Sequence, residues 1–302
     1  AEVKLIGIIA LFKEELRKNK IEAKEATLCL SGKDLVVRTF EIPTLPREEL
    51  KSAINFEVKK YIPFRVEDLI SDFQLKFDKI SRTNLILFVG IKKETLDKYI
   101  SILSQLNIKI NAVEYAAFSL LRCLKLTGTS DKGIIGILGA DLHAKDEVNF
   151  TVLENGFPLF SRDFTLINGP EQAEKPEEAG SAITLEKLKT EIRVSLDYYH
   201  RKFSSKSIKK IFLLFNEDYH SELEAFLKDI GLSVNFIDVA RFTHQPVPFS
   251  LSFIKGYSSS LSKTIKTNIS VNLLAAKEKA LLAKEKVVQK ELEYRFALSW
   301  IE

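Results

Sequence analysis

The sequence has little of what marks a disulfide-stapled, metal-binding or membrane-spanning chain. It holds 2 cysteines, Cys29 and Cys123, and 4 histidines among 302 residues. Both cysteines lie in apolar runs without CxxC spacing, which predicts buried, reduced thiols and neither a disulfide nor a metal site. No apolar run reaches about 18 residues, so we expect no membrane-spanning helix in this stretch of sequence.

The sequence also lacks a large excess of positive or negative charge. It shows no known catalytic motif either. The chain has 45 Lys and Arg against 41 Asp and Glu, mixed along its length, so we expect no nucleic-acid partner. His143, His200, His220 and His244 show neither metal-ligand spacing nor an evident Ser or Cys partner. No P-loop or GxGxxG string occurs. We therefore predict no catalytic residue, no metal and no cofactor.

What the sequence does contain is an alternation of helix and strand patterns. A 3.6-residue apolar spacing predicts helices, and runs rich in β-branched and aromatic residues predict strands. The predicted helices are 3–18, 47–60, 93–106, 116–124, 184–203 and 221–230. The predicted strands are 26–30, 34–42, 71–80, 84–91, 108–113, 133–140, 147–156, 157–167, 209–215 and 233–239, the first two joined in a hairpin at 31–33.

This order predicts an α/β protein of two lobes followed by a tail. A chain of 302 residues exceeds what one core usually holds. Turn-forming residues at 127–130 separate the lobes, which we place at residues 1–128 and 129–266. A polar stretch at 169–181 predicts a mobile loop in the second lobe. Doubled α/β lobes are consistent with an actin-like architecture, although pattern alone leaves other α/β folds open.

Two segments resemble a known family. Residues 45–75, LPREELKSAINFEVKKYIPFRVEDLISDFQL, resemble the P-x-E-E-L, YIPF and D-x-Q string of PilM, the actin-like cytoplasmic component of type IV pilus assembly. Residues 155–164, NGFPLFSRDF, resemble its second-lobe hairpin, and the likeness covers nearly all of residues 10–260. The GspL cytoplasmic domain of type II secretion shares this architecture. The resemblance implies duplicated RNase H-like lobes, with the YIPF subdomain inserted in the first.

Each of these motifs also has a purely structural interpretation. Tyr61, Ile62 and Phe64 suit core positions at a helix end, where the residue before a proline disfavours the helical conformation. Arg162 and Asp163 of the second motif suit a surface pair, which contributes little to stability. The order and co-occurrence of the motifs favour the family.

The resemblance implies a nucleotide site from which this sequence departs. Actin-like sites hold phosphates on glycine-containing hairpins with an Asp. The chain begins with a helix, beyond the first such hairpin. At the second, 134–140, Gly136 stands at the acidic position, and Asp141 follows closely. Residues 216–219, Asn-Glu-Asp-Tyr, replace the glycine-rich adenosine loop. We predict that the fold is retained and the nucleotide chemistry lost. The alternative is a PilM-type ATPase lacking its first phosphate loop, and a carbohydrate kinase is disfavoured.

The tail, 267–302, carries a second resemblance. Its SVNLL string resembles the I-N-L-L motif that PilN, the membrane partner of PilM, inserts into a groove of PilM. This implies a PilN-like docking motif and stem fused to the actin-like lobes; the alternative is the last strand and helix start of the second lobe. The predicted partner-binding residues are Asn272, Leu273, Leu274, Tyr61, Ile62, Pro63 and Phe64.

The flanks of this motif suggest its setting. Residues 275–302 are rich in helix formers and end in aromatic residues, which leaves open a solvated helix, a coiled-coil seam or the approach to a bilayer. The Ser-rich connector, 258–267, would let the motif dock on its own chain or on a neighbour. The resemblance implies a non-catalytic scaffold at the cytoplasmic face of the bacterial inner membrane, which links a motor ATPase to membrane and periplasmic components.

Overall fold

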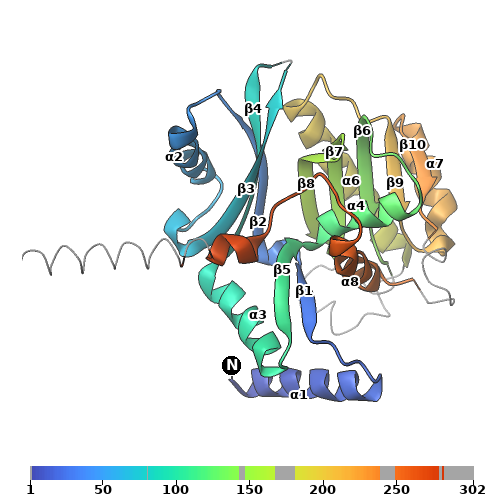
Figure 1. Ribbon diagram of the computed structural model, residues 1–302. Helices are drawn as coiled ribbons and strands as arrows, with labels where there is room; N and C mark the ends of the chain where they lie inside the picture. The colour runs from blue at the N-terminus through green and yellow to red at the C-terminus, as the bar shows by residue number, and fades with distance from the viewer. Residues whose placement is uncertain are drawn as a thin grey trace, which may run out of the picture.

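The strands of this protein form three separate sheets. The computed structural model describes residues 2–79, 81–142, 147–166, 181–238, 249–278 and 281. In this part of the chain the sheets have two, three and five strands. Figure 1 shows the three-stranded sheet on one side, the five-stranded sheet on the other, and the β1–β5 pair below and between them. The predicted mixed α/β class is confirmed.

The three-stranded sheet is antiparallel, with the order β2-β4-β3. Ile54 and Val58 of the helix α2 share a buried cluster with Ile86 and Phe88 of β4. The alternate residues of β4 point to the opposite face and are buried in the main core. The central strand is thus covered on both faces, which explains its unbroken apolar run. The elements are β2 Leu35–Ile42, α2 Arg47–Val58, β3 Leu69–Asp78 and β4 Thr83–Lys92.

The predicted hairpin between the first two strands is wrong. β1 pairs in parallel with β5, whereas β2 pairs with β4. A 3₁₀ turn, η1 (Gly32–Asp34), carries the chain from one sheet to the other and lies close to β8. A Cβ on Gly32 would lie 1.5 Å from the Asp163 Oδ2 atom. The elements are α1 Glu2–Lys18, β1 Glu25–Leu30, α3 Lys93–Gln105, β5 Lys109–Tyr115 and α4 Ala116–Leu126.

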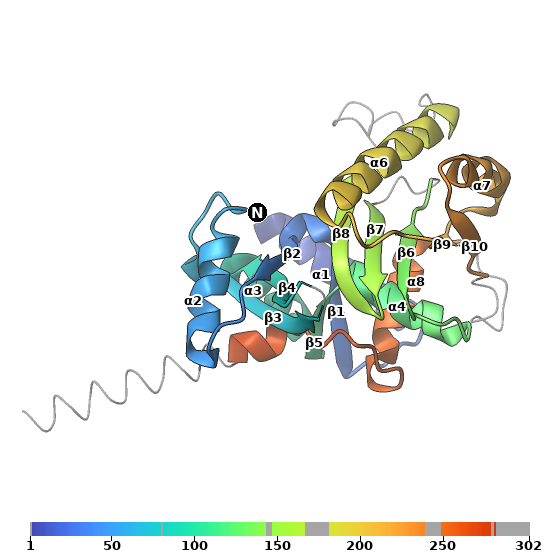
Figure 2. The same ribbon diagram turned by 90° about the horizontal axis from the view of Figure 1, so that it is seen from above.

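The five-stranded sheet has the order β10-β9-β6-β7-β8, and β6, β7 and β8 form the predicted antiparallel meander. Its tight turn, Asn155-Gly156, has φ angles of 52° and 78°, as two-residue hairpins require. Figure 2 shows α6 and α7 on one face and α4 and α8 on the other. The elements are β6 Ile134–Gly139, β7 Glu147–Glu154, β8 Phe157–Thr165, α6 Ser181–Lys202, β9 Lys210–Leu214, α7 His220–Asp229, β10 Ser233–Phe236 and α8 Leu251–Ser260.

The predicted Ser-rich connector is largely an ordered, packed element. Ser258 and Ser259 are buried in α8, and a 3₁₀ turn, η5 (Leu261–Lys263), follows. The Ser259 hydroxyl donates to the Glu114 Oε1 atom at 2.5 Å. Arg122 forms a bidentate pair with the same carboxylate at 2.7 and 2.8 Å. Burial of both serines and the bond of Ser259 to Glu114 therefore anchor this segment, and the expected hinge is wrong for its first half.

A charged cluster joins the three-stranded sheet to the five-stranded sheet. The Lys206 Nζ atom lies 2.6 Å from Asp78 Oδ2 at the end of β3 and 3.0 Å from Glu154 Oε2 at the end of β7. Lys76 of β3 reaches the same Glu154 oxygen at 2.7 Å. Both Lys206 and Asp78 are buried. Removing one partner would leave an uncompensated charge, so the cluster holds the two sheets in one relative position.

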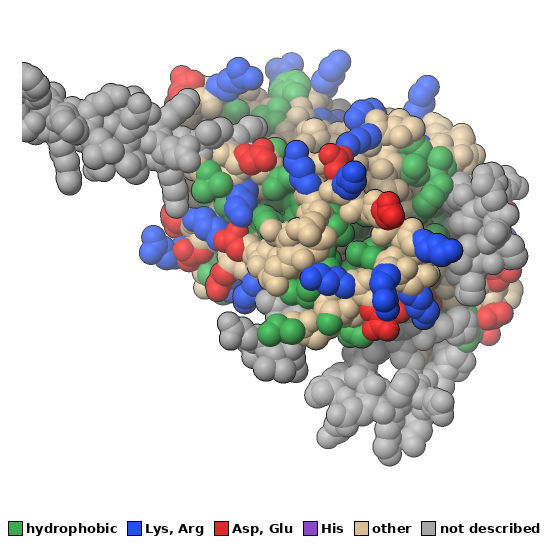
Figure 3. Space-filling model, turned by 60° about the horizontal axis from the view of Figure 1, so that its bottom comes forward, with side chains coloured by type: hydrophobic (Ala, Val, Ile, Leu, Met, Phe, Trp, Pro, Cys, Tyr) green, Lys and Arg blue, Asp and Glu red, His purple; other side chains and the backbone are tan. Residues whose placement is uncertain are grey.

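Some expectations fall on residues outside the described ranges. These are the polar loop at 169–181 apart from Ser181, and the tail beyond residue 281. In the portion of the chain that the structure describes, no helix combines the length and apolar character needed to cross a membrane. Basic and acidic side chains are interspersed on the face that Figure 3 presents.

Candidate functional site

The start of the tail lies against β3 and β5 of its own chain, as the orange to red segment of Figure 1 shows. Residues 273–278 are helical. Leu273 is fully buried in the main core cluster. Apolar neighbours on both sides pack partly against the same cluster: Ile269, Val271, Leu274 and Ala276. The segment therefore completes the core at this point and forms part of the packed structure.

Asn272 is the polar centre of this contact. Its Oδ1 atom accepts hydrogen bonds from the backbone N–H groups of Val113 and Leu274, each at 3.0 Å. The first satisfies a backbone donor of β5, and the second caps the start of the helix at 273–278. The Asn272 backbone N–H donates to Asp72 Oδ2 at 3.0 Å. A single residue thus fixes the register of the tail against two strands.

Gln74 of β3 clamps the tail backbone through its side-chain amide. Its Nε2 atom donates to the Asn268 carbonyl oxygen at 2.6 Å, and its Oε1 atom accepts from the Ser270 N–H at 2.9 Å. These two bonds reproduce what a neighbouring strand would offer to an extended segment. Because Asp72 and Gln74 are two residues apart on a strand, they point to one face and act together.

Two weaker contacts lie at the ends of the docked segment. The Asn268 Nδ2 atom donates to the Asn155 carbonyl oxygen at 2.9 Å, which connects the tail to the β7–β8 turn. Lys277 pairs with Asp97 of α3 at 2.5 Å. The Asp97 side chain is 57% exposed, so solvent screening keeps the contribution of this pair small. The docking free energy therefore comes from the centre of the segment.

The structure does not bring Tyr61, Ile62, Pro63 and Phe64 to the tail motif. Ile62 and Phe64 pack against the α2 side of the three-stranded sheet, with Ile86 and Phe88. Asp72 and Gln74 pair with Val89 and Leu87, which point to the opposite face. The predicted groove beside the YIPF string is therefore on the wrong face of the sheet. Tyr61 instead stacks on Phe40, with ring centroids 6.2 Å apart.

Asp72 and Gln74 are the groove residues that the sequence interpretation missed. They belong to the D-x-Q part of the string that carries the family resemblance. Alternation along the strand gave no usable signal, because it suggests that the polar residues face solvent, whereas Asp72 and Gln74 are half-buried and Phe73 is exposed. Buried polar groups need partners. In the folded chain the partners of Asp72 and Gln74 lie about 200 residues later, in the tail.

The residues aligned with the family's nucleotide loops, Gly136, Asp141 and Asn216, make packing and hydrogen-bond contacts within the five-stranded sheet or at its strand ends. Gly136 is in the middle of β6, where a Cβ would lie 2.9 Å from Ile211 Cγ1, so it is a packing position within the sheet and not part of a turn. Asp141 follows the strand end and is buried. Its Oδ1 atom accepts from Asn216 Nδ2 at 3.3 Å, and Asn216 Oδ1 accepts from the Leu142 N–H at 2.8 Å. These polar groups join the ends of two neighbouring strands.

Histidines and cysteines have structural surroundings where the structure describes them. His220 is 3.1 Å from the Phe215 carbonyl oxygen and stacks on Phe236. Burial raises the pKa of Cys29 to about 11 and that of Cys123 to about 12, so both thiols are poor nucleophiles. His143 and His244 lie outside the described residues. Among those described, no three His, Cys, Asp or Glu residues gather as a metal site would require.

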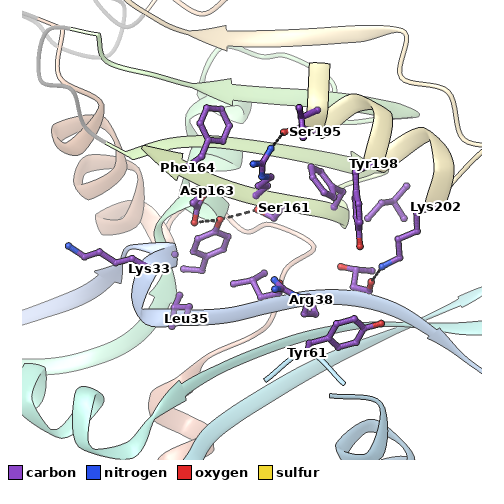
Figure 4. A pocket seen from close by; sticks show the side chains of 18 of the residues that line it. Lys33, Leu35, Arg38, Tyr61, Ser161, Asp163, Phe164, Ser195, Tyr198 and Lys202 are labelled. Carbon is purple, nitrogen blue, oxygen red and sulfur yellow. Dashed lines mark hydrogen bonds between the residues drawn. The ribbon is translucent and has the colours of Figure 1, made fainter. Parts of the chain in front are cut away.

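A second feature is a cavity of about 770 Å³ between β2 and the wall formed by β8 and α6. Figure 4 shows the residues that line it. Arg162 and Asp163, neighbours on β8, point in opposite directions. Arg162 binds Glu191 and Ser195 of α6 at 2.7 and 2.9 Å. Asp163 accepts from the Tyr115 hydroxyl at 2.6 Å. The alternative interpretation of a surface Arg–Asp pair is therefore wrong.

Comparisons with known proteins agree with this architecture. A family model described as type IV pilus assembly protein PilM matches residues 4–173. The PilM-PilN type IV pilus biogenesis complex aligns with a TM-score of 0.65 at 17% identity, over 86% of this chain and 85% of that chain. The predicted actin-like α/β fold is confirmed.

Two other solved structures show weaker similarity. The cytoplasmic domain of EpsL, an inner membrane component of the Vibrio cholerae type II secretion system, has a TM-score of 0.45 at 11% identity, over 86% of this chain and 81% of that one. A Bacteroides thetaiotaomicron protein with an actin-like ATPase fold and unknown function has a TM-score of 0.39 at 12% identity, over 76% and 75% of the two chains.

Proposed function

This chain belongs to the type IV pilus assembly protein PilM family, and from that premise we propose that it is a scaffold which carries its own PilN-like docking segment. The segment is residues 268–277, and the groove is formed by β3 and β5. The observation that carries this proposal is the recognition of the segment by Asp72, Gln74 and the Val113 N–H. The similar solved structure is a PilM-PilN type IV pilus biogenesis complex.

The contacts suit a peptide ligand. Side chains from the groove bind backbone groups of the segment, while alternate apolar residues of the segment fill the core. This division is typical of extended-peptide recognition, in which backbone bonds supply affinity and pockets supply specificity. In this proposal the fused segment gives one polypeptide the roles that PilM and PilN divide. The helix that begins at residue 273 then leads from the lobes toward the membrane.

The proposed scaffold is not an enzyme. The strand ends near Asp141 and Asn216 are bonded to each other, which supports a structural role for groups that would otherwise contact phosphate or metal. The protein would act at the cytoplasmic face of the inner membrane and link a motor ATPase to membrane and periplasmic components. In this role the two lobes supply a rigid connection and no chemistry.

The docking proposal is tested with a pair of introduced cysteines. In the Gln74→Cys, Ser270→Cys variant, a short thiol cross-linker should join the two positions within one chain, and mass spectrometry should find the joined peptides at monomer size. The native Cys123 is buried and Cys29 is half-buried, and the raised pKa of both thiols slows their reaction with the cross-linker. In the control, Phe73→Cys replaces Gln74→Cys, because Phe73 is on the opposite face of β3. Cross-linked dimers from a mixture of the single variants would contradict docking within the chain.

Loss of nucleotide chemistry needs a separate test. Calorimetric titration of the protein with Mg-ATP should give no heat of binding, and no phosphate should be released. Micromolar affinity for Mg-ATP would favour the alternative function, a PilM-type ATPase. That outcome would leave the cross-linking result unchanged, so the two parts of the proposal stand or fall separately.

A further inference from the structure

One end of the cavity between β2 and α6 holds two cations that form no ion pair among the described residues; a third cation, Lys33, lines the cavity on the Asp163 side (Figure 4). Arg38 and Lys202 both line it. The Arg38 Nη1 atom donates to the Val37 carbonyl oxygen at 2.8 Å, and Lys202 Nζ donates to the Thr39 carbonyl oxygen. In the described portion of the chain, no carboxylate forms an ion pair with either side chain. The other charged residues of the wall, Arg162 and Asp163, are already bonded to Glu191 and Tyr115.

Aromatic side chains complete the cationic end of the cavity. In Figure 4, Tyr198 and Lys202 project from α6 toward Arg38 and Tyr61 on the opposite wall. The Arg38 guanidinium lies 5.9 Å from the centre of the Tyr61 ring. Tyr61 and Tyr198 remain 36% and 47% exposed, so their rings are available to a ligand. The end of the cavity thus offers two positive charges, the Tyr198 hydroxyl and two aromatic rings, whereas the Tyr61 hydroxyl already donates to Glu57 Oε1 at 3.3 Å.

From this arrangement we propose that the cavity binds a small phosphate monoester with an apolar or aromatic group, held at its phosphate by Arg38 and Lys202. A phosphate monoester carries close to two negative charges near neutral pH, which matches two unpaired cations. Guanidinium and phosphate form bidentate, charge-assisted hydrogen bonds. The apolar group would lie against Tyr61, Tyr198 and the half-exposed Val194.

The surroundings of Lys202 agree with this assignment. Burial lowers the pKa of Lys202 and the nearby charge of Arg38 lowers it further, and together they outweigh the opposing effect of the carboxylates of Glu41 and Glu57, which do not form ion pairs with Lys202. Two cations close together in a partly desolvated site repel each other, and a bound dianion relieves that repulsion. A bound phosphate would therefore attract both cations and offset the repulsion between them.

The site is separate from the region where the family resemblance implies a nucleotide. Thr39, next to Arg38, donates to the Pro158 carbonyl oxygen at the start of β8. Asp141 follows Gly139, which pairs with Asn149, and Asn149 pairs with Asp163 near the other end of β8. The cationic end and Asp141 therefore lie at opposite ends of the five-stranded sheet. The inference also does not depend on the docked tail.

Calorimetry with phenyl phosphate tests the inference, at fixed ionic strength with chloride as the other anion. The wild-type protein should bind phenyl phosphate with one site per chain, and phenol should not bind. Arg38→Gln should weaken binding at least tenfold, about 1.4 kcal/mol, as expected for one lost charge-assisted contact. Arg65→Gln removes the same charge at a side chain that is 77% exposed and outside the cavity, so its affinity should stay within twofold of wild type.

Three results would overturn the proposal. The first is no saturable binding of phenyl phosphate at millimolar concentration. The second is equal weakening by Arg38→Gln and Arg65→Gln, which would indicate general charge attraction. The third is equal binding of phenol and phenyl phosphate, which would remove the role of the phosphate. A melting temperature of Arg38→Gln equal to that of wild type confirms that the variant is folded.

Discussion

Replacing Asn272 with alanine tests the central contact of the docked tail. The change removes the acceptor of the Val113 N–H and the cap of the helix at 273–278. An unsatisfied, partly buried N–H costs about 1–3 kcal/mol, and loss of an Asn cap about 0.5–2 kcal/mol. Because water reaches part of this site, we expect a combined loss of about 2–4 kcal/mol in the free energy of docking.

Hydrogen exchange at the Val113 amide measures this loss directly. Docking protects the amide, so a decrease of 2–4 kcal/mol should speed its exchange by roughly 30-fold to 1,000-fold when opening is local. Asn268→Ala is the matched control, because Asn268 is exposed and its amide bonds a surface turn; its effect should stay below about 0.5 kcal/mol. Equal protection of Val113 in Asn272→Ala and wild type would refute the reasoning.

Three further predictions concern the junction between the sheets. Gly32→Ala should lower the free energy of unfolding by about 1–3 kcal/mol in denaturant titrations, because its Cβ would displace the Asp163 carboxylate; unchanged stability would show that the turn can shift. Lys206→Met should cost about 3–5 kcal/mol by leaving Asp78 and Glu154 uncompensated, and recovery in Lys206→Met with Asp78→Asn would identify charge as the cause. Burial acts to raise the pKa of Glu154, but hydrogen bonds from Lys76 and Lys206 outweigh it and lower the pKa below 4.5. The carboxylate therefore stabilises the fold above pH 4.5 and loses this effect as pH falls through its folded pKa, so Glu154→Gln should flatten the acid limb of a stability–pH curve; an unchanged limb would contradict this.

Local patterns in the sequence predicted the positions of helices and strands better than they predicted which strands pair with one another. The apolar run of β4 and the amphipathic spacing of α2 depend on burial of nearby residues, and both were found within a few positions of their predicted bounds. The partner of β1 was not predictable in this way, because it lies about 80 residues later in β5. Adjacent strands with a short turn suggest a hairpin, whereas the actual partners of β1 and β2 are distant strands of two different sheets.

The docking site shows the same limit. The tail motif was located from its own residues, and the structure places Asn272, Leu273 and Leu274 in a packed contact. The groove was expected beside the YIPF string, which carries part of the family resemblance. The groove residues are polar because they bind backbone groups, and their face of the sheet follows from strand register. Register is a property of the folded sheet and cannot be obtained from the YIPF string alone.

The short distance between η5 and Asn268 has a consequence for competition. Only residues 264–267 separate the anchored turn from the docked segment, so the segment can explore little volume when it leaves the groove. A short tether of this kind gives an effective concentration of about a millimolar or more. A free peptide with the same intrinsic affinity would have to reach that concentration to occupy half of the grooves. A second protein that uses this groove must therefore bind far more tightly than the tail, or act by pulling on the helix that follows it.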